Sequence, residues 1–306
     1  MFLSLGKMGR KDISHFFFTL GIVIASFGLI GYIPITLALN YLSNEGVVIS
    51  EVSDLQKYFG LNTFFLFLLV PFMTGFISLL ACVKWIHNRE IITVFTSRIK
   101  FDWKRFIFSF LLWGGVMLLF FVISIFAGYP ISFNFHLETF IPLVLISFFI
   151  LPIQTTFEEF FFRGYLFQGL GLILKKGWLS VLITGVLFGL MHGSNPEVEK
   201  IGTVLLAFYI LNGIFLGVVV LMDDGLELSM GYHAVNNIFA ALVVTNDWQA
   251  FHTDALFIDK TPPEFGLENI ITLLVIQPLF LLIFSRKYKW SNWKERLFNS
   301  HKIGIK

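Results

Sequence analysis

Long apolar runs are the feature that most restricts how this chain can fold. Several stretches are almost free of charge over about eighteen or more residues, the length that lets a helix cross a bilayer. Of all residues 56% are hydrophobic and 14% charged, whereas about 25% of a typical globular domain is charged. We predict an all-α, polytopic membrane helical bundle with about eight transmembrane helices, at residues 16–39, 61–83, 106–127, 140–174, 178–192, 201–222, 228–245 and 268–284.

The predicted helices belong to one integral membrane domain, because no polar linker divides the chain. Residues 1–139 form a three-span region with a basic interfacial loop, residues 140–245 the core, and residues 246–306 the last span and a basic tail. The single cysteine, Cys82, excludes an internal disulfide framework. The many phenylalanine side chains are expected to face lipid.

Basic residues are concentrated on one side of the predicted membrane domain. Eight spans place both termini on that side, together with 18 of the 22 Lys and Arg residues. Cytoplasmic loops carry such an excess, so we expect both termini in the cytoplasm. The loop 84–105 interleaves tryptophan with basic residues and is predicted to be an interfacial helix. High Phe, Ile and Lys usage favours a bacterial inner membrane.

The segment 157–163 places three charges inside the fourth apolar run. A charge at the bilayer centre costs about 2.5–3.5 kcal/mol on insertion scales, so such residues are usually functional. Glu159 and Arg163 are four residues apart and can pair on one helical face. Glu158 points about 100° away, so we expect the two carboxylates to face different targets and Glu158 to be an unpaired general base. The structural alternative is an ion network that locks two helices. Pro152, just before this segment, is expected to kink the helix.

Two of the seven histidines lie on predicted spans. His192 ends the fifth span and shares a face with Phe188, four residues earlier. His233 and Asn237 have the same spacing and can donate two hydrogen bonds to one oxygen, as an oxyanion hole does; the alternative is a polar clamp between helices. On straight helices His192 and His233 lie at different depths, so either the fifth helix is tilted or the predicted boundaries are off by a turn.

Three ordered motifs connect these residues: Glu-Glu-x-x-x-Arg at 158–163, Phe-x-x-x-His at 188–192 and His-x-x-x-Asn at 233–237. In a multi-span chain this order resembles the CPBP family, the CAAX-protease and bacteriocin-processing intramembrane endopeptidases that are also called Abi proteins. All three motifs are complete, and the resemblance covers residues 140–245.

The resemblance implies a hydrolase that cleaves peptide bonds from an active-site cavity within the bundle. Carried over to this chain, Glu158 and His192 activate a water, while His233 and Asn237 stabilise the oxyanion. Glu159 and Arg163 support the helix geometry. A zinc ion, if one takes part, would be bound by Glu158, His192 and His233. The family has been described both as metalloproteases and as glutamate peptidases, and we slightly favour activation without a metal because the His233/Asn237 pair resembles a clamp.

The partners expected are the lipid bilayer and a peptide or protein substrate at the membrane, with no nucleic acid. The substrate is either a prenylated CAAX tail or a membrane-near peptide such as a pheromone or bacteriocin leader. We favour the second, because bacteria generally lack CAAX prenylation. The rival functions are a transporter or ion relay, and a non-catalytic immunity or scaffold protein of the same fold. The sequence leaves the oligomeric state open.

Acidic residues outside the motifs have simpler expected roles. Asp223, Asp224 and Glu227 are predicted to form a turn and a helix start, where acidic groups favour the helix dipole. Glu197 and Glu199 are predicted to be solvated in a loop.

Overall fold

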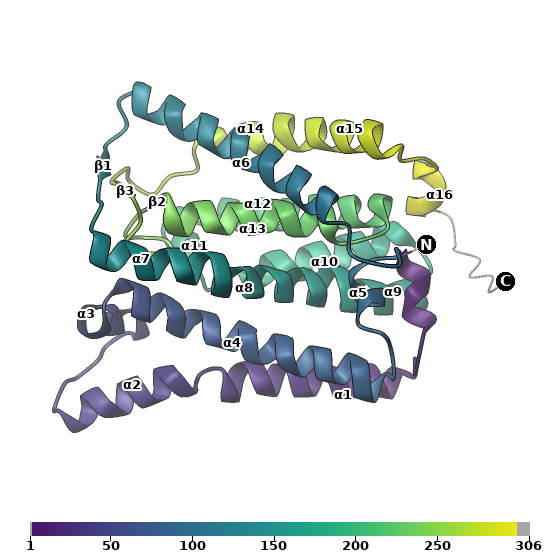
Figure 1. Ribbon diagram of the computed structural model, residues 1–306, viewed down its shortest axis with the longest axis horizontal. Coiled ribbons are helices and arrows are strands. Elements are labelled where there is room, and N and C mark those ends of the chain that lie inside the picture. The colour runs from purple at the N-terminus through teal and green to yellow at the C-terminus, as the bar shows by residue number, and fades with distance from the viewer. Residues whose placement is uncertain (1, 299–306) are drawn as a thin grey trace.

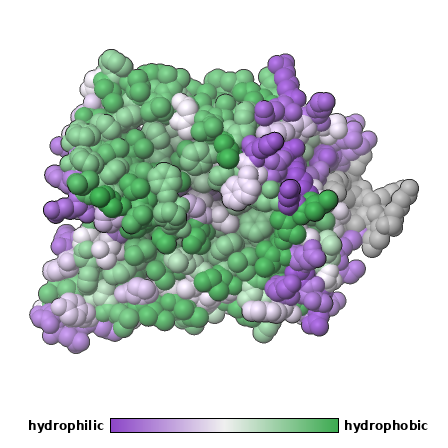
Figure 2. Space-filling view, viewed as in Figure 1, coloured by the Kyte–Doolittle hydropathy of each residue, from purple (hydrophilic) through white to green (hydrophobic). Residues whose placement is uncertain are grey.

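The computed structural model describes residues 2–298, which form a bundle whose long helices run along a common direction (Figure 1). Between the two polar ends of the bundle, the visible surface is mainly apolar (Figure 2). Both features are those of an integral membrane protein. Within residues 2–298, six helical segments are long and apolar enough to cross a membrane, namely Ile13–Asn44, Leu61–Ile86, Trp103–Phe126, Leu137–Leu174, Thr203–Asp223 and Leu267–Tyr288.

The regular elements are short pieces joined into these longer segments. The helices are α1 Ile13–Ala25, α2 Ile33–Asn44, α3 Leu55–Phe59, α4 Leu61–Ala81, α5 Ile92–Phe95, α6 Trp103–Phe126, α7 Leu137–Leu145, α8 Leu151–Glu158, α9 Phe167–Leu174, α10 Gly177–Met191, α11 Pro196–Ile201, α12 Thr203–Asp223, α13 Glu227–Leu242, α14 Leu267–Ile271, α15 Gln277–Tyr288 and α16 Trp293–Phe298. The strands are β1 Ile131–Phe133, β2 Val244–Thr245 and β3 Phe257–Asp259.

Every predicted span coincides with a helical segment, but two of these helices are short. The fifth predicted span is α10, which is apolar but shorter than the six long segments. The seventh is α13, which packs against α6, α8 and α12 in the centre of the bundle (Figure 1). Most side chains of α13 are buried, so this helix carries its histidine and asparagine into the protein interior rather than into lipid.

Several of the long helices contain a wide π-helical turn close to a proline. The turns at Ser26–Ile30, Ile146–Ile150 and Thr272–Ile276 come shortly before Pro34, Pro152 and Pro278. A proline ring clashes with the carbonyl four residues earlier, and in each case that carbonyl lies in the π-helical turn. The disturbance expected at Pro152 therefore takes the form of a local widening of the helix. A further turn, Glu159–Leu166, contains no proline and carries part of the charged motif.

A small sheet joins the loops at one end of the bundle, where the sequence predicted only irregular structure. Its strand order is β1-β3-β2, with β1 antiparallel and β2 parallel to β3. Strand β2 follows α13 directly, so the sheet ties the end of that helix to two long loops. Strands of two or three residues are too short to produce an alternating pattern in the sequence.

Phenylalanine side chains do not all face lipid, contrary to the prediction. Many are fully buried because they fill the interior between helices, including Phe65, Phe160, Phe167, Phe280 and Phe284.

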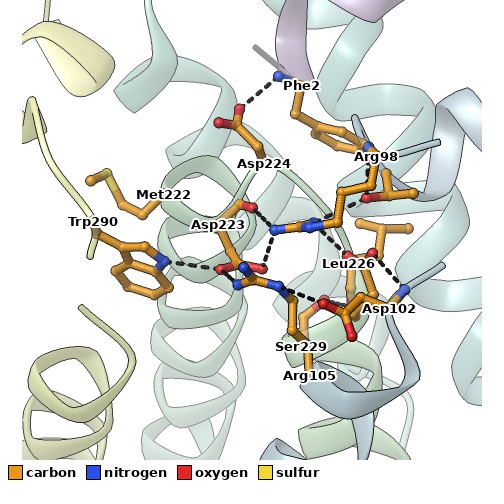
Figure 3. Close-up of polar contacts among 12 residues, drawn as sticks. Phe2, Arg98, Asp102, Arg105, Met222, Asp223, Asp224, Leu226, Ser229 and Trp290 are labelled. Atoms are coloured by element: carbon orange, nitrogen blue, oxygen red, sulfur yellow. Dashed lines mark hydrogen bonds and ion pairs between the residues drawn. The ribbon is translucent and has the colours of Figure 1, made fainter. Parts of the chain in front are cut away.

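The turn between α12 and α13 is held by a buried network of charges (Figure 3). Arg98 pairs with Asp223 and with Glu227, each at 3.1 Å. Arg105 also pairs with Asp223. Asp223 is 4% exposed and Glu227 is fully buried. These acids are therefore buried ion-pair partners, whereas we predicted only that they form a turn and a helix start. The segment 84–105 is correspondingly not one interfacial helix: it contains the end of the π-helical turn Cys82–Ile86, the short helix α5 and the first residues of α6, which include Arg105.

Both ends of the described chain meet at this same turn. The backbone N–H of Phe2 donates to Asp224 at 2.8 Å, and Arg296 of α16 donates to the other carboxylate oxygen at 2.8 Å. The two terminal segments therefore lie at one end of the bundle (Figure 1), as expected for an even number of spans.

Candidate functional site

The Glu159–Arg163 pair expected from the sequence lies at the centre of the bundle. Arg163 Nη1 donates to Glu159 Oε1 at 3.0 Å, and both side chains are fully buried. The guanidinium also lies over the ring of Phe188, 3.8 Å from its centroid, and Nη2 donates to the carbonyl of Gly213 at 3.4 Å. The pair thus joins the segment Glu159–Leu166 to α10 and α12. Because both side chains are buried and held by these contacts, neither can reach a substrate.

His233 lies between the two carboxylates, which corrects one expectation. Its Nδ1 is 3.0 Å from Glu159 Oε1 and its Nε2 is 3.5 Å from Glu158 Oε2. We predicted that the adjacent acids would face different targets, because successive helical residues diverge. Instead, one imidazole occupies the space between them, since its two nitrogens point in different directions and each meets one carboxylate.

A second contact joins α8 and α13 one helical turn away from Glu158. Gln154 of α8 donates through Nε2 to Glu158 Oε1 at 2.7 Å, and its Oε1 accepts from Asn237 Nδ2 at 2.9 Å. Residues four apart share a helical face. Gln154 and Glu158 on α8 therefore oppose Asn237 and His233 on α13, in reverse order along the chain.

His192 is joined to His233 through the ring of Phe188. The His192 ring contacts that of Phe188, with centroids 4.7 Å apart, and Phe188 in turn contacts His233 at 5.9 Å. Phe188 thus bridges the two imidazoles, which accommodates the difference in depth noted in the sequence. His192 is half-buried, and its Nδ1 is 2.8 Å from the carbonyl oxygen of Phe188.

Tyr209 holds the imidazole of His192 from its other side. The two rings stack with centroids 4.3 Å apart, and the tyrosine hydroxyl donates to Glu197 Oε1 at 2.8 Å. Glu197 is only 7% exposed and also accepts from the N–H of Ala250 at 2.9 Å. The prediction that Glu197 is solvated is therefore wrong: α11 folds back against α12, so the carboxylate is enclosed.

Exposure separates the polar residues into two groups. Glu158, His233 and Asn237 are 8%, 7% and 8% exposed, so each presents a small edge outside the packed interior. Glu159 and Arg163 are 0% exposed. Within residues 2–298, Glu158 Oε2 is buried and has no hydrogen-bond partner. Glu159 Oε2 also has no partner among these residues, but Glu159 is 0% exposed, so Glu158 Oε2 is the open acceptor nearer the edge of the site.

The proposed zinc ligands are not gathered into a binding group. Among the residues that the structure describes, no cluster of three or more His, Cys, Asp or Glu is arranged to hold a metal ion. In particular, Phe188 lies against both imidazoles of the set Glu158, His192 and His233.

The motifs did not identify Gln154, Tyr209 and Glu197. Gln154 could have been found, because it precedes Glu158 by four residues and so shares its helical face. Tyr209 and Glu197 lie on other elements at irregular spacing, and nothing in the local sequence marks them.

A buried acid–imidazole–amide group enclosed by membrane-length helices defines a polytopic membrane protein with an interior polar site. Residues 137–239 match the profile of the family described as "Rce1-like: Type II CAAX prenyl endopeptidase Rce1-like". The matched region contains all the motif residues, and through it the chain is similar to the Rce1-like family.

One curated relative also matches the chain. It is the "Uncharacterized protein YyaK" of Bacillus subtilis (strain 168), 36% identical over 171 residues, which is 53% of this chain. The chain spans 55% of the length of that relative. No solved structure matches the chain.

Proposed function

We propose that this protein is an intramembrane endopeptidase that uses Glu158 to activate water against a peptide bond. The observation that carries the proposal is the unpartnered oxygen of Glu158, 3.5 Å from His233 Nε2 at the edge of a buried ion cluster. The match of residues 137–239 to a family described as Type II CAAX prenyl endopeptidases supports it.

The charges of this cluster indicate which hydrogen atoms it holds. His233 Nδ1 faces the Glu159 carboxylate at 3.0 Å and therefore carries a hydrogen. If Nε2 carries one too, the ring is an imidazolium, and with Arg163 it balances Glu158 and Glu159. Uncompensated charge is costly in a buried site, so we propose this balanced set as the resting state.

The reaction follows from that arrangement. A water bound against Glu158 Oε2 gives a proton to this carboxylate while its oxygen attacks the carbonyl carbon of the substrate. The carbonyl oxygen becomes an oxyanion and accepts from His233 Nε2 and from the second Nδ2 hydrogen of Asn237. The cluster then has one excess positive charge, which stabilises the adjacent oxyanion. Glu158 finally passes the proton to the leaving nitrogen, and the peptide bond breaks.

The second imidazole and the supporting pair have separate proposed roles. His192 completes the water site from the exposed side of Phe188. Glu159 and Arg163 hold His233 in one orientation. Substrates are peptides or proteins held at the membrane, and we favour membrane-near peptides over prenylated tails. We propose that the protein lies in a bacterial inner membrane with both termini in the cytoplasm, because 18 of its 22 Lys and Arg residues are predicted on the side of the termini.

Reconstituted vesicles test this function against the rival ion relay. Purified protein in phosphatidylglycerol–phosphatidylethanolamine vesicles is incubated with the membrane-protein fraction of cells that lack this chain. Mass spectrometry then counts new peptide termini, and an enclosed pH dye reports proton flux. We expect new termini with the wild-type protein, none with Glu158→Ala, and no flux with either. Flux that depends on Glu158, without new termini, would favour a relay.

The same vesicles separate the two substrate classes. Quenched fluorescent peptides of randomised sequence are supplied in two forms, one tethered by an N-terminal acyl chain and one ending in a farnesylated Cys-aliphatic-aliphatic-X tail. We expect cleavage of the acyl-tethered form. Cleavage of the farnesylated form alone would assign the protein to prenylated substrates.

A further inference from the structure

We propose that Gln154 is a positioning residue that fixes the orientation of both Glu158 and Asn237; this inference rests on the function proposed above. Gln154 is 4% exposed and lies on α8, one turn before Glu158. Its amide contacts Glu158 at 2.7 Å and Asn237 at 2.9 Å. It thereby links the acid that activates water to the amide that binds the oxyanion.

The carboxylate determines how the glutamine amide is oriented. An ionised carboxylate only accepts hydrogen bonds, so the glutamine must direct its NH₂ group toward Glu158. The carbonyl oxygen of Gln154 then faces Asn237 and requires a donor there. Asn237 must therefore also turn its NH₂ group toward the site, which is the group that an oxyanion needs.

The rest of the Asn237 amide agrees with this orientation. Its Oδ1 accepts from Asn236 Nδ2 at 3.2 Å, so the oxygen is directed away from Gln154. One Nδ2 hydrogen is used by Gln154, and we assign the second to the substrate. A carbonyl directed into the site would instead repel a developing oxyanion. An Asn237 amide in the opposite orientation would therefore destabilise the oxyanion rather than stabilise it.

Gln154 also selects which oxygen of Glu158 reacts. Oε1 is held by the glutamine, whereas Oε2 has no hydrogen-bond partner within the described residues 2–298. Fixing one oxygen leaves the other directed toward His233, where the water is proposed to bind. Losing the amide would free the carboxylate to rotate and would remove the orientation of Asn237 together with it.

The experiment is a double-mutant cycle on the rate at which new termini appear in the vesicle assay described above. Gln154→Met keeps the length of the side chain but removes both hydrogen bonds, and we expect it to slow cleavage by about 10–100-fold, short of the loss when an oxyanion donor is removed. Thr155→Val changes the neighbouring buried residue, whose hydroxyl donates to the carbonyl of Pro152, and should leave the rate unchanged. Thermal unfolding in detergent is measured for each variant.

Coupling in the cycle separates positioning from a structural effect. If Gln154 acts partly by orienting Asn237, that part of its effect is already absent in Asn237→Ala, so Gln154→Met should slow the Asn237→Ala variant by clearly less than it slows the wild-type protein. A full multiplicative loss in the double variant would overturn the inference. Should Gln154→Met fail to fold, Gln154→Asn, which withdraws the amide by one methylene, takes its place in the cycle.

The outcomes distinguish this inference from the proposed function. Cleavage that is lost in Glu158→Ala but unchanged in Gln154→Met would reject the role of Gln154 and leave the peptidase intact. The absence of new termini with the wild-type protein would reject both.

Discussion

Replacing Glu158 with glutamine should reduce the rate of peptide cleavage by about 10³-fold, within the range attributed to a general base. The amide cannot take the proton of the attacking water. Its shape is the same, and its oxygen can still accept from Gln154 Nε2, which is 2.7 Å from Glu158 Oε1 in the structure. The fold and membrane insertion should therefore be retained. Initial rates of terminus formation in the vesicle assay measure the loss of cleavage, and thermal unfolding of the purified variant measures whether the fold is retained.

Glu199 provides the matched control for this substitution. It is an exposed carboxylate on α11, so Glu199→Gln makes the same chemical change away from the cluster and should leave the rate unchanged. Equal rates for Glu158→Gln and the wild-type protein would remove Glu158 from the reaction.

Replacing Arg163 with methionine should destabilise the protein by about 3–5 kcal/mol, the cost of leaving one member of a buried ion pair without its partner. Arg163 and Glu159 are both 0% exposed, so water cannot replace the lost contact. At about 2–4 °C per kcal/mol for a domain of 150–250 residues, we expect the unfolding temperature in detergent to fall by about 10 °C. The double variant Glu159→Gln/Arg163→Met should recover much of this loss, because it removes the stranded charge.

An exposed ion pair in the same protein provides the control for Arg163→Met. Lys57 and Asp54 lie 2.5 Å apart, with the lysine side chain 68% exposed. Lys57→Met also removes a cation from a pair, but solvent screens such pairs, so its unfolding temperature should match that of the wild-type protein. A loss in Arg163→Met no larger than in Lys57→Met would refute the assigned role of the buried pair.

The positions of the helices could be predicted from the sequence because apolar runs of membrane length have few other structures open to them. The burial of α13 inside the bundle could not be predicted, because its apolar run resembles those of the other predicted spans. The burial of acidic residues beside the turns could not be predicted either. Asp223 and Glu197 border apolar runs in the sequence, yet both are buried, because the chain folds back and brings arginines or a tyrosine over them.

Within the site, helical spacing predicted contacts along one helix but not across helices. It identified the Glu159–Arg163 pair, and the same rule applied backward from Glu158 would have identified Gln154. It could not place one imidazole between two adjacent carboxylates, because spacing gives the direction of a side chain and not what occupies the space beyond it. The bridging position of Phe188 between His192 and His233 likewise depends on how α10 packs against its neighbours.

The most direct measurement of the central claim is comparative membrane peptidomics of cells that carry either the wild-type protein or Glu158→Ala, in the presence and absence of a chelator. We predict a set of membrane-derived peptides that occurs only with the wild-type protein and persists in chelator. Identical peptide profiles in the two strains, with both proteins inserted at equal levels, would contradict the account.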